Sequence, residues 1–118
     1  MPSFSKSPPE LVARFAELAE LVPEATRRPM FGYPSLVIGG HMFAGLYQDS
    51  LVLRLGAGDR AELTSRHGAA QFEPMPGRPM TGFVIVPPAL VADPAVERWL
   101  GRAFEHAKSL PPKKPKPS

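Results

Sequence analysis

The sequence of 118 residues contains no cysteine. Disulfides, thiolate nucleophiles and cysteine-ligated zinc are therefore excluded. The sequence also has no apolar run near the roughly 18 residues that a membrane-spanning helix needs. Residues 1–15 contain no apolar segment after a basic start, so we expect no secretory signal. These absences favour a cytoplasmic protein that does not enter the membrane.

Most of the chain also lacks a net charge. There are 14 lysines and arginines against 11 acidic residues, a formal net charge of +3. Lys113, Lys114 and Lys116 lie in the final stretch 111–118, which has no acid, so eleven basic residues face eleven acidic ones elsewhere. We expect residues 111–118 to form a disordered Pro/Lys tail and residues 1–6 a flexible N-terminus. Such a tail adds only weak, salt-sensitive affinity for nucleic acid.

Two long amphipathic helices are predicted, one near each end of the folded body. In the first, Ser7 suits the N-cap, Glu10 completes a capping box and Pro23 ends the helix. Asp93-Pro94 marks the start of the last helix. The apolar positions at helical spacing are Leu11, Phe15, Leu18 and Val22 in the first helix, and Trp99, Leu100, Ala103, Phe104 and Ala107 in the last.

Short strands fill most of the sequence between these helices. They are predicted at residues 35–38, 42–47, 51–55, 69–73 and 81–86. Gly39-Gly40 is typical of a tight hairpin turn, because both residues tolerate positive φ. After the third strand we expect a short helix that Asp59 caps and Gly68 ends.

The predicted order is therefore α-β-β-β-α-β-β-α. Each long helix has one apolar face to bury, and the hairpins make the first three strands antiparallel. The fold class that satisfies both is α+β, a two-layer sandwich with a five-stranded antiparallel sheet and helices on one side. We expect one such domain over residues 7–110, since a chain of this length supports one modest core.

Phe43 and Gly45 stand out within the second predicted strand. If Met42 faces the helices, alternation places Phe43 and Gly45 on the opposite face of the sheet. A glycine inside a strand can mark close approach by a ligand or a second subunit. It can also simply permit sheet twist or a bulge, and this is the interpretation that we favour.

Four blocks of the sequence together resemble the TfoX N-terminal domain family. The blocks are residues 28–32, 39–45, 51–56 and 77–86, and Trp99 and residues 109–113 agree with them. The resemblance covers residues 11–113 and implies an α-β(3)-α-β(2)-α two-layer sandwich. The family takes its name from competence regulators in which a helical domain follows this one. We therefore do not carry over their competence role or DNA contact, and the resemblance transfers no catalytic residue.

Residues for catalysis or metal binding are not grouped in the sequence. His41, His67 and His106 have no i, i+4 partner and no His-Glu helix motif, so we predict no metal site. No nucleophile elbow, phosphate-binding loop or dinucleotide fingerprint is present. We therefore expect no cofactor and no enzymatic activity.

Three arginines form a candidate binding patch together with Phe43 and Gly45. Arg28 precedes the first predicted strand, Arg54 lies in the third, and Arg78 lies in the loop before the last. If they converge, they can hold a carboxylate or phosphate, although isolated surface arginines are mostly passive. Our main functional hypothesis is a non-catalytic regulatory or interaction module that binds an unknown protein partner or itself. The alternative is a small-anion or nucleic-acid binding protein that uses these arginines and the lysine tail.

Overall fold

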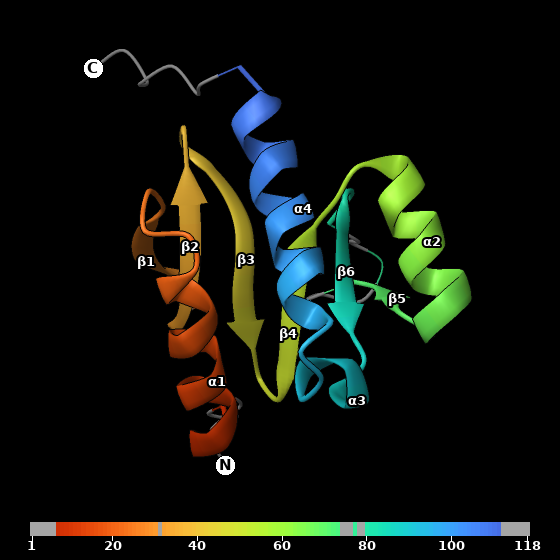
Figure 1. The fold of residues 1–118 in the computed structure, drawn as a ribbon, viewed down its shortest axis with the longest axis horizontal. Helices are drawn as coiled ribbons and strands as arrows, with labels where there is room; N and C mark the ends of the chain where they lie inside the picture. The colour runs from red at the N-terminus through yellow and green to blue at the C-terminus, as the bar shows by residue number, and fades with distance from the viewer. Residues whose placement is uncertain (1–6, 31, 74–76, 78–79, 112–118) are drawn as a thin grey trace.

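The structure is a computed structural model that describes residues 7–30, 32–73, 77 and 80–111. All strands in it pair antiparallel in one sheet of order β1-β2-β3-β4-β6-β5. Helices α1 and α4 lie across the same face of this sheet (Figure 1). The elements are α1 (Pro9–Glu20), β1 (Thr26–Met30), β2 (Tyr33–Ile38), β3 (His41–Tyr47), β4 (Ser50–Arg54), α2 (Ala57–His67), β5 (Ala70–Gln71), β6 (Phe83–Val86), α3 (Pro88–Val91) and α4 (Val96–Ser109).

The predicted α+β fold is confirmed, but the count of five strands is wrong because the sheet of the described residues has six. The additional strand is β1, whose residues are exposed apart from a half-buried Met30. A strand that buries neither face has no apolar alternation to reveal it. It forms because each of its residues from Thr26 to Met30 is paired with a residue of β2. The short helix α3 was also not predicted.

Two prolines lie opposite one another in the β1–β2 pair. Pro29 is paired with Pro34, and the ladder between β2 and β3 begins one residue later, at Ser35. Proline has no backbone N–H to give to a ladder, so it is tolerated at edges and strand ends. Pro29 therefore also weakens the open edge of β1 as a template for another strand.

The start of α1 differs from the prediction. Pro8 occupies the N-cap position and makes no side-chain cap. The hydroxyl of Ser7 instead donates to the carbonyl oxygen of Gln48 at 2.6 Å, which ties the start of α1 to the turn after β3. The predicted capping box is thus wrong, since the hydroxyl that was to cap the helix is used in a tertiary contact.

The cap predicted for α2 is also wrong. Gly56 is the N-cap residue and no side-chain cap bond is formed, because Asp59 contacts Arg102 on α4 instead. The predicted stop at Gly68 is confirmed by its left-handed φ of 75°. At the start of α4, Asp93 Oδ1 accepts a hydrogen bond of 2.8 Å from the backbone N–H of Ala95.

An extra residue in β3 decides which side chains face α4. Leu36 is paired with Ala44 but Val37 with Met42, so Phe43 is a bulge residue opposite no partner. Phe43 is fully buried with its ring edge-on to Phe104, at a centroid distance of 5.5 Å. The predicted alternation is therefore wrong for two residues: Phe43 packs under α4, and Met42 packs with the apolar cluster on the rear face, which is the face opposite α1 and α4.

Gly45 is small because Met42 lies across it. A Cβ atom added at Gly45 would stand 2.6 Å from Cε of Met42 and 3.2 Å from Cβ of Ser35. The close approach that a strand glycine signals is thus made here within the chain, by the flexible end of Met42 and by the fixed Cβ of Ser35.

This packing predicts that residues 42 and 45 are energetically coupled. We expect Gly45→Ala to destabilise the wild-type protein and to cost less in a Met42→Ala background, with a coupling of about 0.5–1.5 kcal/mol, typical of residues in contact. Urea unfolding of the two single variants and the double variant measures it. Gly58→Ala is the matched control, because a Cβ at Gly58 meets no atom within 4 Å. Equal costs of Gly45→Ala in both backgrounds would contradict this account.

Candidate functional site

The arginines of the predicted patch do not come together among the described residues. The register places Arg28, on β1, in one row across the sheet with Val52, on β4, and Arg54 lies two residues beyond Val52. Three inter-strand spacings of about 4.8 Å therefore separate them sideways. The guanidinium carbon of Arg54 lies 5.7 Å from the ring centroid of Phe83, on the side of β4 away from β1. Arg78 lies outside the described residues.

The other two residues of that patch are internal. Phe43 is fully buried beneath α4, and Gly45 is buried on the rear face under Met42. Neither residue offers a surface to a ligand in this structure. Both instead shape the two faces of the sheet.

Arg54 belongs to a different group of cations that sequence reasoning missed. A Cβ at Gly82 would lie 3.6 Å from Nη1 of Arg60 and 3.8 Å from Cγ of Arg54, so both arginines border this glycine. Arg60 donates from Nη1 to the carbonyl oxygen of Leu55 at 2.6 Å. His106, on α4, is held at the same end of β4, where its Nδ1 is 3.5 Å from the Cβ position of Gly56. Arg54, Arg60 and His106 come from three separate segments of the chain, so no local sequence motif indicates the group.

The pKa of His106 is lowered from its ordinary value of 6.5. Partial burial is the largest cause, the positive charges of Arg54 and Arg60 act in the same direction, and Asp59 opposes them. His106 is consequently neutral in the folded protein at pH 7. Because the folded-state pKa is the lower one, the contribution of His106 to stability is present above pH 6.5 and is lost as the pH falls through the folded-state pKa.

This arrangement predicts a specific response to charge removal. We expect the NMR titration midpoint of His106 to lie below 6.5 and to rise in both Arg54→Gln and Arg60→Gln, because each substitution removes a like charge. Glu105→Gln, at the neighbouring residue of α4, is the control. We expect the titration midpoint of His106 to stay below 6.5 in this variant. A midpoint above 6.5 in the wild-type protein would contradict the assignment.

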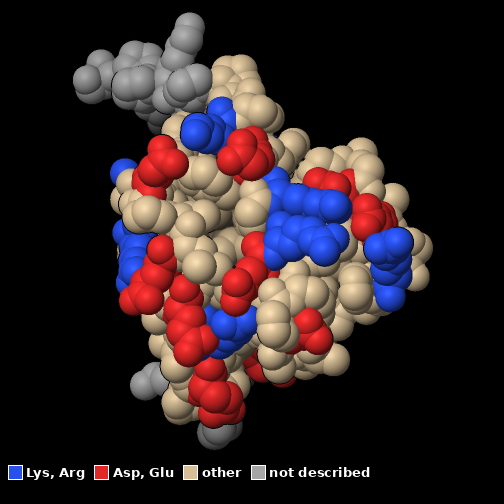
Figure 2. All heavy atoms as spheres, viewed as in Figure 1, with Lys and Arg blue, Asp and Glu red and all other residues tan. Residues whose placement is uncertain are grey.

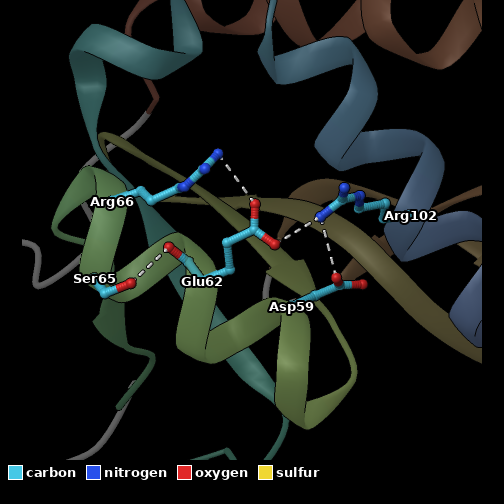
Figure 3. Close-up of polar contacts among 5 residues, drawn as sticks. All are labelled: Asp59, Glu62, Ser65, Arg66 and Arg102. Carbon is cyan, nitrogen blue, oxygen red and sulfur yellow. Dashed lines mark hydrogen bonds and ion pairs between the residues drawn. The ribbon is translucent and has the colours of Figure 1, made fainter.

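A polar cluster joins α2 to α4 (Figure 3). Arg102 Nη1 lies 3.2 Å from Asp59 Oδ1 and 3.3 Å from Glu62 Oε1. Glu62 also contacts Arg66 at 3.4 Å, and Ser65 donates to its backbone carbonyl oxygen at 3.3 Å. The guanidinium of Arg102 stacks over Trp99, with Cζ 4.7 Å from the ring centroid. The charges of this cluster are thus engaged with one another, which favours a structural role.

Replacing Arg102 tests this structural role. We expect Arg102→Met to lower the free energy of unfolding by about 1–2 kcal/mol, since half-exposed ion pairs and one cation–π stack are each worth about 0.2–1 kcal/mol. Arg102→Lys restores only part of the loss, because an ammonium cannot stack as a plane. Arg66→Met, which removes the more exposed partner of Glu62, is the control and costs less. The account fails if Arg102→Met leaves the urea midpoint unchanged.

A further candidate, one of several depressions on the described surface, is an apolar hollow between α1 and the β1–β2 hairpin. Its volume is about 450 Å³. Val12, one of its lining residues, is 41% exposed. The lining residues are Val12, Phe15, Ala16, Ala19, Arg27, Arg28, Pro29, Gly32, Tyr33, Pro34 and Ser35.

The charged residues that line this hollow are Arg27 and Arg28, and acidic side chains lie nearby on the surface. Acidic side chains gather over α1, and basic ones lie at the edge of the molecule beside β1 (Figure 2). A second groove of about 810 Å³, between the end of α1 and α4, is rimmed by Asp59, Arg98, Arg102 and Glu105. A preformed apolar surface with a few polar groups is what binding sites usually offer. The hollow beside α1 fits that description better than the charged groove.

Comparison with known proteins identifies the family. The TfoX N-terminal domain family matches residues 16–107, most of the chain. The chain belongs to the TfoX N-terminal domain family. The matched part of this TfoX N-terminal domain begins within α1 and ends within α4, so it includes the Arg102 cluster, the whole sheet and most of the lining of the hollow, but not Val12 and Phe15. No curated protein and no solved structure was found to match.

In the part of the chain that the structure describes, no three histidine, aspartate or glutamate side chains gather as a metal site would require. No helix within the same residues has the length and apolar character to cross a membrane.

Proposed function

We propose that this TfoX N-terminal domain is a cytoplasmic, non-catalytic regulatory or interaction module that binds a protein through the hollow beside α1. The observation that carries the proposal is the hollow itself, an apolar surface between α1 and the β1–β2 hairpin with Val12 exposed in its lining. Burial of a half-exposed valine and its neighbours in an interface contributes about 1 kcal/mol or more per side chain. The interaction is therefore hydrophobic at its centre and polar at its margin.

The disposition of the polar groups also supports a binding role. Asp59, Glu62 and Arg102 are engaged in holding α2 against α4. Arg28 and Arg54, the two described members of the predicted anion patch, lie apart. The apolar hollow consequently has more support as a site than an anion-binding or nucleic-acid-binding patch does.

Site-specific photo-crosslinking in cells tests the proposed function. We expect a photoreactive phenylalanine analogue at Val12 to give discrete protein adducts of defined mass. The same analogue at Leu21, which is 51% exposed on the other groove, is the matched control and gives none. Equal labelling from both positions, or none from position 12, would refute binding through the hollow.

A further inference from the structure

The occupant of the hollow can be specified further. Resting on the proposed function, we propose that the hollow is filled by a second copy of this chain. The two copies form a two-fold symmetric dimer in which α1 of each copy packs on α1 and the β1–β2 hairpin of the other. Val12 of each copy enters the hollow of its partner.

The projecting side chain and the hollow that would receive it lie next to each other on the same surface. Val12 and Leu21 are the two exposed large hydrophobic residues of the described chain, and Val12 lines the hollow. Ala16 follows Val12 one helical turn later on the same face, and its small side chain lets another helix approach closely. A two-fold interface uses the same patch twice, so it needs a projection and its complement side by side.

The charges around the hollow are also complementary to a second copy. Arg27 and Arg28 line the hollow, are exposed, and form no ion pair within the described residues. Glu20 follows Ala16 by one helical turn on the exposed side of α1, next to the hollow but not among the residues that line it. It too is exposed and has no ion pair among the residues that the structure describes. A partner whose surface carries charge of one sign could pair with either the arginines or Glu20 but not with both. A second copy in inverted orientation presents charges of both signs.

Strand addition is the less suitable way to cover this surface. Pro29 removes one of the few backbone N–H groups on the open edge of β1, and Arg27 and Arg28 project from the same short strand. Prolines and charges are the usual means by which an edge strand avoids pairing with another chain. The contact therefore depends on side chains of α1 and the hairpin, which is the arrangement that an inverted copy supplies.

Sedimentation velocity over a concentration series tests the dimer with the full chain. Because one short helix and a hairpin form a small interface, we expect a weak, concentration-dependent dimer. Val12→Asp raises the dimer dissociation constant at least tenfold. Leu21→Asp, at the other exposed large apolar residue, which lies outside the hollow, changes it less than twofold.

A charge-swap pair provides the decisive test. Arg27→Glu and Glu20→Arg each weaken self-association, since each homodimer then opposes like charges. An equimolar mixture of the two variants recovers the dimer mass, because every Arg–Glu contact across the interface is opposite in sign again. Arg98→Glu, an exposed arginine on α4 outside the hollow, is the control and leaves the wild-type constant unchanged.

A wild-type chain that stays monomeric at millimolar concentration overturns the dimer. The dimer is also overturned if Leu21→Asp disrupts association as strongly as Val12→Asp, or if the charge-swap mixture stays monomeric. If position 12 crosslinks a different protein while the chain remains monomeric, self-association fails and binding through the hollow stands. If position 12 crosslinks nothing, both proposals fail.

Discussion

The packing of α4 on the sheet depends on the bulge at Phe43. The buried stripe of α4 needs an apolar partner at its centre, and the extra residue in β3 turns the Phe43 ring toward Phe104. Burying a phenylalanine side chain contributes about 1.5–3 kcal/mol, a large share of the net stability of a small domain. The same bulge sends Met42 to the rear face, where it occupies the space that Gly45 leaves. One inserted residue thus sets the packing of both faces.

The functional interpretation follows from how the helices share the sheet. In Figure 1, α4 crosses the middle of the sheet, while α1 lies to one side of it near the β1–β2 hairpin. The Arg102 cluster is engaged in joining α2 to α4, so its charged groups serve the fold. The hollow beside α1 has apolar walls and no such internal use, which is why the proposed binding role is placed there.

Much of the fold was predictable because its signals are local. The Gly39-Gly40 turn, with φ values of 60° and 82°, has the backbone that the glycine pair implied. The apolar stripe of the last helix is buried as its spacing predicted. Strand β1 was missed because it has no buried face, and the bulge was missed because Phe43 differs from its neighbours in nothing that the sequence displays. Asp59 was assigned to a cap because its contact with Arg102 is far away in sequence.

The candidate site was less predictable than the fold. Arg28 and Arg54 lie apart because β2 and β3 stand between β1 and β4 in the sheet, and this strand order is not encoded in any local sequence pattern. The hollow combines α1 with a hairpin that includes β1, so a prediction without β1 could not contain it. In the sequence, Val12 looks like any other apolar helix residue. Only its exposure in the folded chain distinguishes it.

The central claim is that the binding surface of this protein is the apolar hollow beside α1. Backbone amide shifts of the isotope-labelled chain, followed as unlabelled chain or a captured partner is added, test it most directly. The account predicts that the shifts which move belong to α1 and the β1–β2 hairpin. Movement confined to the surroundings of Arg54, Arg60 and His106 would contradict it.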